Sequence, residues 1–361
     1  MLELELVDKK DEIAVNSFIS QSKNNNFRQT TYWGEIKKAS GWHCACYALK
    51  KDTQIVAVAT ILIRKLGRLP FSLMYCCRGP IVDWSNSEVV EELFSQLGGV
   101  VKRHNGLCLR FDPEPDEWFE KQQMLLKKHQ VFSIPEKVTV WNRAVYSTRV
   151  LLNESEEQLF HKMRRTHRQN INKACLLGVS FVGSALPDDK EVFFNLMCGL
   201  EERRHSLIHS KNYYDTIYEN TVGQNRGTFL KAIYNDEVIS GLVVTIVGNR
   251  AWALYLANDY SYRKLMPNKL LMWESIKIAK KAGCTFLDLG STQGTEGFNP
   301  NEDNLDMLKS AYRPVIVNFP GYFDVPGKYY RLFRIAEKEL FPKINYIYYK
   351  AQRILSTFKK K

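Results

Sequence analysis

The chain has 361 residues, a length that predicts about two domains. Hydrophobic residues make up 45% of it and charged residues 25%, which excludes disordered and fibrous classes of protein. Lysine and arginine outnumber aspartate and glutamate by 51 to 39, and the net charge of +12 favours anionic partners such as nucleic acid, lipid headgroups or phosphorylated precursors.

The N-terminal segment MLELELVDKKDE lacks the basic and apolar regions of a secretory signal, so the sequence predicts a cytoplasmic protein. Its eight cysteines are therefore expected to be reduced and buried. His43, Cys44 and Cys46 lie close together, but no CxxC pair completes a four-ligand set, and no metal site is expected. No apolar run approaches the roughly 18 residues that can span a bilayer. The longest run, at 55–63, has the length of a strand.

Two distant segments resemble each other, ALKKDTQIVAVATILI at 48–63 and AIYNDEVISGLVVTIV at 232–247. Each contains two apolar, β-branched stretches around a polar turn, centred on Asp52 in one and Asp236 in the other. This pattern predicts a β-hairpin in both places.

Each hairpin is followed by a helical pattern that leads to a short strand, at 88–113 and at 267–291. Gly106 and Gly283 are expected to end these helices, because glycine adopts the left-handed conformation at little cost. The order helix, hairpin, helix, strand therefore occurs twice, which favours duplication of one unit over a chance likeness of two unrelated domains. The predicted class is α/β, with mixed sheets flanked by helices.

The predicted first domain comprises residues 1–147 and 319–361, and the second comprises residues 148–318. The join follows a strand-like stretch and precedes an N-cap pattern that begins at Asn153. Three prolines between 314 and 326 interrupt the second repeat, so the last segment is expected to cross back and pack on the first domain.

Positive charge is concentrated in two segments. Residues 161–173 hold five Lys or Arg and no acid, and residues 328–361 hold ten Lys or Arg and two acids. Within the second segment, apolar residues recur at spacings of three or four from Ile344 to Phe358, which predicts an amphipathic helix. We expect its apolar stripe to pack on the protein, and the alternative is that it lies on an anionic membrane surface.

The repeated unit is similar to the GNAT acyltransferase fold, which implies two tandem GNAT-like domains. In that fold, a glycine-rich turn before a helix lets backbone amides hold the pyrophosphate of coenzyme A. The matching stretch here, YRKLMPNK at 262–269, has no glycine, and Pro267 has no amide hydrogen to donate. The stretch DWSNS at 83–87 in the first repeat also lacks glycine. A donor other than coenzyme A is therefore expected.

Seven motifs in chain order resemble those of the FemABX family. They are FRQTxxW from residue 27 with Lys37 and Gly41-Trp42, YxxRGPIVD from 75, LRFDP from 109, MxxTxRxNIxxAxxxGV from 163, LxPxxLLxWE from 265, DxG from 288 and LKxxY from 308. The resemblance implies a tandem GNAT-like enzyme that transfers an amino acid from aminoacyl-tRNA to the peptide of a peptidoglycan precursor. Two positions depart from the family pattern. His167 separates Thr166 from Arg168, and the position of a precursor-binding arginine is occupied by His209 or Ser210.

The same resemblance implies that Asp112 and Lys309 act in catalysis. Asp112 ends a strand and can orient or deprotonate the attacking amine, and the alternative is a turn-capping aspartate. Lys309 can stabilise the oxyanion or the tRNA terminus, and the alternative is a solvated lysine. An ester donor is already activated, so no covalent enzyme nucleophile is required, and the chain contains no GxSxG elbow.

The resemblance also implies that Lys37, Tyr213, Tyr214 and Tyr255 bind the acceptor substrate. Lys37 matches a lysine that binds precursor phosphate, and a register shift of one residue would exchange it with the solvent-facing Lys38. One of the two adjacent tyrosines supplies a family tyrosine. Tyr255 matches another, although it lies on an apolar strand, where packing in the core is the alternative.

Three arginines, Arg164, Arg165 and Arg168, lie at helical spacing with no acid between them. They are candidates to bind tRNA phosphates, a contact that depends on salt and carries no sequence information. A solvated helix face is the alternative.

The sequence therefore predicts an aminoacyltransferase that needs no cofactor and uses aminoacyl-tRNA as donor. The acceptor is the side-chain amine of a stem peptide in a UDP-linked or lipid-linked peptidoglycan precursor. The protein is expected to be a cytoplasmic monomer. Peripheral association with the inner face of the membrane through its basic C-terminal helix is the alternative to packing of that helix on the protein. Two alternatives are a GNAT-fold acyltransferase with a thioester donor and a non-catalytic module that binds RNA or a membrane surface.

Overall fold

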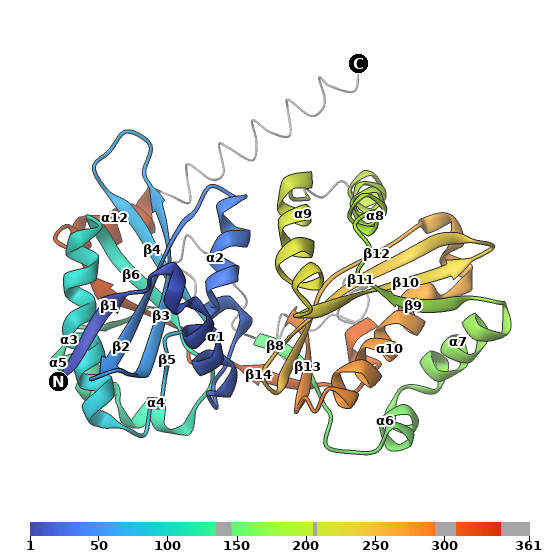
Figure 1. Ribbon diagram of the computed structural model, residues 1–361, viewed down its shortest axis with the longest axis horizontal. Helices are drawn as coiled ribbons and strands as arrows, with labels where there is room; N and C mark the ends of the chain where they lie inside the picture. The colour runs from blue at the N-terminus through green and yellow to red at the C-terminus, as the bar shows by residue number, and fades with distance from the viewer. Residues whose placement is uncertain (135–145, 205–207, 293–307, 341–361) are drawn as a thin grey trace.

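The computed structural model describes residues 1–134, 146–204, 208–292 and 308–340. The chain forms two β-sheets that lie next to each other, each covered by helices (Figure 1). The predicted α/β class with mixed sheets is confirmed. Among the described helices, none is both long and apolar enough to cross a bilayer.

The first sheet has eight strands in the order β1-β2-β3-β4-β6-β15-β7, and the short β5 pairs with β3. The strands are β1 (Leu2–Leu6), β2 (His43–Lys51), β3 (Gln54–Lys65), β4 (Ser72–Cys77), β5 (Ile81–Val82), β6 (Gly106–Asp112), β7 (Phe132–Ile134) and β15 (Tyr322–Pro326). Its helices are α1 (Glu12–Gln21), α2 (Thr31–Lys38), α3 (Ser87–Arg103), α4 (Glu117–Lys121), α5 (Gln123–Lys128) and α12 (Tyr330–Glu339). Only the β4–β6 pair is parallel among the described strands of this sheet.

The second sheet has seven strands in the order β14-β8-β13-β12-β11-β10-β9. The strands are β8 (Tyr146–Leu151), β9 (Ser180–Ser184), β10 (Gly227–Tyr234), β11 (Glu237–Val247), β12 (Arg250–Asn258), β13 (Phe286–Thr292) and β14 (Val315–Asn318). Its helices are α6 (Glu156–Lys162), α7 (Arg165–Leu176), α8 (Asp189–Arg204), α9 (Lys211–Asn220) and α10 (Pro267–Lys281), with a 3-10 helix, η5 (Tyr260–Leu265), before α10.

Both sheets contain the repeat that the sequence predicts. The β2–β3 and β10–β11 hairpins turn at Asp52 and Asp236, whose φ angles of 56° and 64° fall in the left-handed region. Each hairpin continues into a third strand, a long helix and a final strand that is parallel to the third. The segment β2-β3-β4-α3-β6 therefore corresponds to β10-β11-β12-α10-β13.

The two predicted helix-ending glycines have different outcomes. Gly283 has a φ of 76° and follows α10, as predicted. At the end of α3 the left-handed residue is Asn105, with a φ of 49°, and Gly106 is instead the first residue of β6, so that prediction was wrong. Asparagine tolerates the left-handed conformation better than most residues. Gly106 is required for space, because a Cβ there would lie 2.4 Å from the sulfur of Met74.

The chain passes from β14 of the second sheet to β15 of the first within a few residues. β8 pairs along its whole length within the second sheet, so the predicted join at 147–148 falls inside this strand. The division of the chain into domains at these positions stays a prediction. The amphipathic helix predicted from Ile344 to Phe358 lies outside the described residues.

α12 is fixed to the first sheet by the buried guanidinium of Arg110 on β6. Its Nε donates to Asp324 Oδ1 at 2.7 Å, and its Nη1 donates to Glu337 Oε1 at 2.5 Å. Arg334 also pairs with Glu337. Burial alone would lower the pKa of Arg110, but the hydrogen bonds to the two carboxylates outweigh it and raise that pKa. Phe333 packs inward beside this cluster, so one face of α12 is committed to the first domain.

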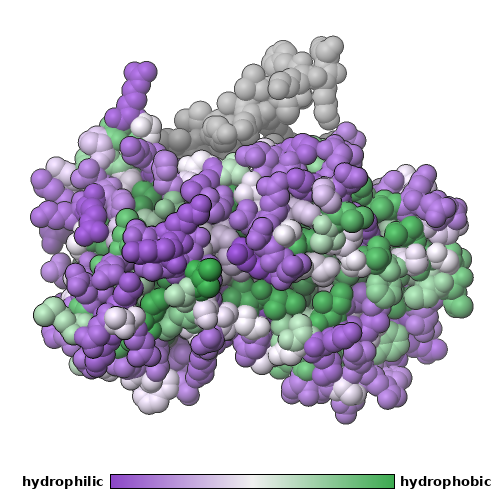
Figure 2. Space-filling view, viewed as in Figure 1, coloured by the Kyte–Doolittle hydropathy of each residue, from purple (hydrophilic) through white to green (hydrophobic). Residues whose placement is uncertain are grey.

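A hydrophobic cluster crosses the junction between the two sheets, where α2 packs against α9. Phe27 lies at its centre, with ring centroids 5.2 Å from Trp33 of α2 and 5.0 Å from Trp252 of β12. Figure 2 shows hydrophilic side chains over most of one face of the molecule and hydrophobic ones exposed near its middle. The shared cluster holds the two halves together as neighbours with a common core.

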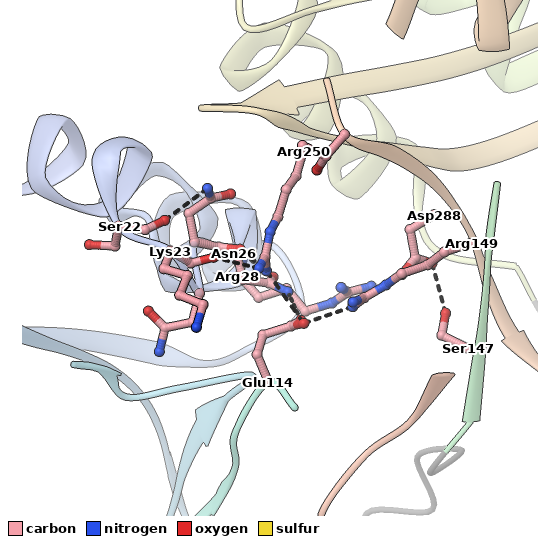
Figure 3. A network of polar contacts seen from close by, with 12 residues as sticks. Ser22, Lys23, Asn26, Arg28, Glu114, Ser147, Arg149, Arg250 and Asp288 are labelled. Atoms are coloured by element: carbon pink, nitrogen blue, oxygen red, sulfur yellow. Dashed lines mark hydrogen bonds and ion pairs between the residues drawn. The ribbon is translucent and has the colours of Figure 1, made fainter. Parts of the chain in front are cut away.

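Polar contacts cross the same junction around Glu114, which follows β6 (Figure 3). Glu114 accepts from Asn26 Nδ2 at 2.6 Å and from Arg149 Nη2 at 2.7 Å, and Arg250 Nη1 lies 3.4 Å away. Arg149 also reaches Asp288 of β13. Burial raises the pKa of Glu114, but the nearby arginines lower it by a larger amount. The pKa of this carboxyl is therefore below its ordinary value. The carboxylate therefore stays charged and joins residues of both halves.

The eight cysteines carry free thiols, as predicted, but they are not all buried. Cys175 lies on the exposed side of α7, and Cys44 and Cys198 are partly exposed. No group of three or more His, Cys, Asp or Glu in the described part of the chain has a metal-binding arrangement.

Candidate active site

A cavity of about 580 Å³ opens in the second half, between β12, the start of α10 and the end of β13. Residues of α8 and the segment 308–312 complete its wall. Four cations line it, Arg203, Arg263, Lys269 and Lys309. The described residues of its lining include no acidic side chain, so the cavity suits an anionic ligand.

The start of α10 faces this cavity without the donors of a phosphate-binding turn. Met266 precedes the helix with a φ of 59°, and Pro267 occupies the first helical position and has no amide hydrogen. The amide of Lys269 is already bonded to the carbonyl of Met266 at 3.1 Å. A pyrophosphate at this helix end would therefore find fewer main-chain donors than a glycine-rich turn supplies.

Lys309 is the most buried cation of the cavity, with 6% of its surface exposed. Its Nζ donates to the carbonyl of Ser291 at 2.5 Å, just beyond Gly290. The amide of Gly290 is held by Asp288 at 2.8 Å, so the end of β13 is a fixed support for the ammonium group. A cation fixed in a partly buried cavity can stabilise negative charge that develops on a bound ester.

Tyr312 lines the cavity, and His167 packs against it from behind. Tyr312 donates to the carbonyl of Lys269 at 3.3 Å, and burial raises its pKa. The ring of His167 meets Tyr312 edge to face, with centroids 5.6 Å apart. Neither ring nitrogen of His167 has a hydrogen-bond partner in the described structure. Burial lowers the pKa of His167 to about 4, helped by the cations Lys269 and Arg164.

We expect His167 to make the protein less stable in acid. The unfolded histidine has an ordinary pKa of 6.5, so between pH 6.5 and pH 4 the unfolded chain binds a proton that the folded chain does not. The contribution of neutral His167 to the free energy of unfolding is therefore fully present above pH 6.5, and it is lost as the pH drops toward 4. We expect a loss of about 1–2 kcal/mol after allowing for solvent screening at this half-buried ring.

Denaturant unfolding at about pH 7.5 and about pH 4.5 measures this loss. In His167→Gln, the decrease in unfolding free energy between the two conditions should be smaller than in the wild type by that amount. Equal decreases in the two proteins would contradict the assignment of this titration to His167.

A second cluster of candidate residues lies at the junction, beside the cavity. Lys37 Nζ lies 5.1 Å from the ring centroid of Tyr213 and 5.3 Å from that of Trp33. The Tyr213 and Tyr255 hydroxyls lie 3.3 Å apart, and the ring of His209 lies 3.9 Å from that of Tyr213. Tyr255 also lines the cavity, so the cluster and the cavity are contiguous.

The structure separates Lys37 from its neighbour Lys38. Lys37 is partly buried against the aromatic rings, whereas Lys38 is exposed and pairs with Glu35 at 2.6 Å. Burial lowers the pKa of His209, and the Lys37 ammonium lowers it further, so this imidazole stays neutral beside the lysine. Tyr214 is buried behind the cluster, and its hydroxyl accepts from the amide of His209 at 3.4 Å.

Asp112 lies in the first half and is not among the residues that line the cavity with Lys309. It is buried, accepts from the amide of Arg78 at 2.7 Å, and lies 3.2 Å from the Arg78 guanidinium. These contacts hold the loop after β4 and favour the alternative that Asp112 is a structural turn residue. Its role as a base stays a prediction.

The three candidate tRNA-binding arginines differ in their exposure and in their hydrogen bonds. Arg165 is exposed at the start of α7, and the amide of Arg164 is bonded to the carbonyl of Ala311. The guanidinium of Arg168 turns back to the carbonyls of His161 and Met163, at 2.5 and 2.7 Å, where α6 ends. Arg168 is therefore bonded within the turn between α6 and α7. The three arginines do not form the single exposed basic face that their spacing predicts.

Sequence reasoning missed Arg203, Arg263 and Lys269 as cavity residues. Arg203 and Arg263 both lie over the ring of Tyr260, with centroid distances of 4.7 and 4.3 Å. Arg263 and Lys269 lie in the segment 262–269, and the cations beside the expected helix start were a usable signal in the sequence. Arg203 comes from a distant helix, and only the fold brings it to the same cavity.

The comparisons with known proteins match both halves of the chain. The FemAB family model matches residues 11–131, and an acetyltransferase (GNAT) domain model matches residues 161–298. The chain is 24% identical to the lipid II:glycine glycyltransferase of Staphylococcus epidermidis, over 86% of this chain and 90% of that protein. It is 23% identical to the protein of the same name from Staphylococcus haemolyticus, over 80% of this chain and 84% of that one.

Solved structures share the arrangement of both sheets. The crystal structure of FemX superposes with a TM-score of 0.82 at 19% identity, over 93% of this chain and 100% of FemX. A tandem GNAT protein from the clavulanic acid biosynthesis pathway superposes with a TM-score of 0.51 at 10% identity, over 90% of this chain and 98% of that one. The predicted pair of GNAT-like domains is therefore confirmed.

Proposed function

We propose that this chain, whose residues 11–131 match the FemAB family model, is a member of that family and an aminoacyltransferase of peptidoglycan bridge formation. The donor is aminoacyl-tRNA, and the acceptor is the side-chain amine of a precursor stem peptide. Similar proteins named lipid II:glycine glycyltransferase support a lipid-linked acceptor. The proposal includes no cofactor, and charged tRNA is the donor substrate.

One observation carries the proposal most directly: a cationic cavity is contiguous with a lysine–tyrosine cluster through Tyr255. Two substrates that react with each other need adjoining sites, because the reacting atoms must meet at about 3–3.5 Å. The cavity suits the anionic end of the tRNA, and the cluster suits the precursor.

In the proposed reaction, the neutral acceptor amine attacks the carbonyl carbon of the ester between the amino acid and the tRNA ribose. The new C–N bond forms, the C–O bond to the ribose breaks, and the proton lost by the amine neutralises the departing ribose oxygen. Negative charge develops on the carbonyl oxygen, and Lys309, which lines the cavity, can stabilise it. Arg203 and Arg263 at the same wall can bind donor phosphates. Arg164 and Arg165 remain candidates for further tRNA contacts.

The proposed acceptor site is built around Lys37, whose ammonium group can bind the phosphate of the precursor. Tyr213 and Tyr255 present hydroxyl groups to the same space, and Tyr214 supports them from behind. Approach of the protein to the membrane through its basic C-terminal helix remains part of the proposal, as does a monomeric state. That helix lies outside the described residues.

Lys37→Gln should raise the KM for the acceptor roughly tenfold or more and change kcat little, because one charge-assisted contact to the precursor is lost. Initial rates measured over a range of acceptor concentrations at saturating donor give both constants. Lys38→Gln is the matched control, since Lys38 lies next in sequence and pairs with Glu35 on the surface. Equal effects of the two substitutions would contradict the proposed role of Lys37.

The direct test is a reconstituted reaction. The protein is incubated with a mixture of charged tRNAs and purified precursors, and the products are analysed by mass spectrometry. We expect the precursor to gain the mass of one aminoacyl residue only when charged tRNA is present. Transfer of an acyl group from a thioester, with none from charged tRNA, would replace the proposal with the alternative acyltransferase.

A further inference from the structure

The outer face of α12 carries large apolar side chains that are exposed in the described part of the protein. Leu332 and Ile335 are three residues apart on the same side of the helix, with 65% and 62% of their surface exposed. Leu340, directly after the helix, is 51% exposed. Isolated exposed leucines are common, but an aligned apolar row on a helix marks a surface that contacts another apolar phase.

This row cannot turn inward, because the opposite face of α12 is already committed. Phe333 is buried in the first domain, and Glu337 is bound to Arg110. The cluster described above therefore fixes the rotation of the helix and keeps Leu332 and Ile335 outside. Their exposure follows from the fold and not from a loosely attached helix end.

Positive charge surrounds the apolar row. Lys328, Arg331 and Lys338 are exposed along the same segment. Of the two acids in this segment, Glu337 is neutralised by Arg110 and Arg334, which leaves Glu339. The exposed side chains of residues 328–340 therefore include three cations and one acid, Glu339, which gives this surface a net positive charge.

A neighbouring loop extends this surface. The β3–β4 loop, residues 66–71, exposes Arg68 and also Leu69, with 59% of the leucine accessible. The loop is joined to the start of α12 by Phe71 and Tyr329, whose ring centroids lie 5.1 Å apart. We define the α12 surface as this loop together with residues 328–340, two elements that each pair apolar with basic side chains.

We propose that the α12 surface lies on an anionic lipid bilayer, with Leu332, Ile335 and Leu69 entering the headgroup–acyl boundary. The basic side chains beside them contact anionic headgroups. Burial of the apolar side chains and these electrostatic contacts both strengthen binding. Nucleic acid would engage the cations but leave the apolar row in water. A second copy of this chain would place two cationic faces against each other, which is unfavourable. This site goes beyond the transfer reaction, and no step of that reaction depends on it.

The full-length protein is tested by co-sedimentation with vesicles of phosphatidylglycerol and phosphatidylcholine, and with vesicles of phosphatidylcholine alone. We expect binding to the anionic vesicles, weakening as salt rises, and roughly tenfold lower affinity in the double variant Leu332→Ser/Ile335→Ser. The matched control is Leu176→Ser/Leu186→Ser, which removes two residues of the second domain that are 87% and 61% exposed. The control should bind vesicles like the wild type.

Three results would overturn the proposal: equal vesicle affinity of the wild type and the α12 double variant, equal binding to neutral and anionic vesicles, or a wild-type dimer that the double variant abolishes. Circular dichroism and the rate with a water-soluble precursor should be unchanged in the double variant, which excludes misfolding as the cause. Vesicle binding is measured without substrates, so its outcome is independent of the proposed aminoacyl transfer.

Discussion

Lys309→Met should lower kcat roughly 100- to 1,000-fold, the range found when a fixed group that stabilises an oxyanion is removed. Methionine retains the length and apolar volume of the side chain but has no charge. The ammonium group is supported by the carbonyl of Ser291, so the wild-type cation needs no rearrangement as charge develops. Single-turnover rates at saturating donor and acceptor measure the effect on the chemical step.

Two further variants make this result interpretable. Lys264→Met removes an exposed cation from the neighbouring η5 and should leave the rate within a factor of about two of the wild type. Lys309→Arg keeps the charge in a different geometry and should recover part of the rate. A rate near the wild-type value in Lys309→Met would show that this lysine does not stabilise the transition state.

Arg110→Met should lower the free energy of unfolding by about 3–5 kcal/mol, because it leaves two carboxylates buried without their shared cation. Burial raises the pKa of Asp324, and the nearby guanidinium of Arg110 offsets this only in part. Without Arg110, one of the two carboxylates must bind a proton, or α12 must detach from the sheet so that Glu337 reaches water. Denaturant unfolding monitored by tryptophan fluorescence measures the loss.

A compensated variant separates the buried charges from simple packing. Arg110→Met combined with Asp324→Leu and Glu337→Met removes all three charges and should regain most of the lost stability, since apolar residues of similar volume often replace buried ion clusters well. Equal instability of the single and the triple variants would mean that the cost arises from shape and not from unpaired charge.

The repeat and its hairpins could be predicted because both signals are local. Alternating β-branched residues give strands, and the polar residues around Asp52 and Asp236 give the turns, which the structure has in the left-handed conformation. The end of α3 was harder, because Asn105 and Gly106 are adjacent and either can follow a helix. Gly106 pairs with Ser72 of β4, far away in sequence, and this pairing makes it part of the strand.

Only part of the candidate site could be predicted from the sequence. The family resemblance predicted Lys309, Lys37 and Tyr255 as site residues, and the structure brings all three to the cavity or to the cluster beside it. Motifs do not report partners, so the pairing of Asp112 with Arg78 could not be anticipated. The turn of Arg168 toward the α6 carbonyls depends on the helix connection for the same reason.

The central claim is that the cavity beside α10 takes the end of a charged tRNA in place of a coenzyme A thioester. It is tested most directly by titrating the protein with a non-hydrolysable aminoacylated oligonucleotide that has the sequence of the tRNA acceptor end, followed by competition with acetyl-coenzyme A. We predict saturable binding that weakens steeply with salt, is reduced in Arg203→Gln/Arg263→Gln, and is not displaced by the thioester. Tight binding of acetyl-coenzyme A that displaces the oligonucleotide, or no binding of the oligonucleotide at low salt, would contradict the account.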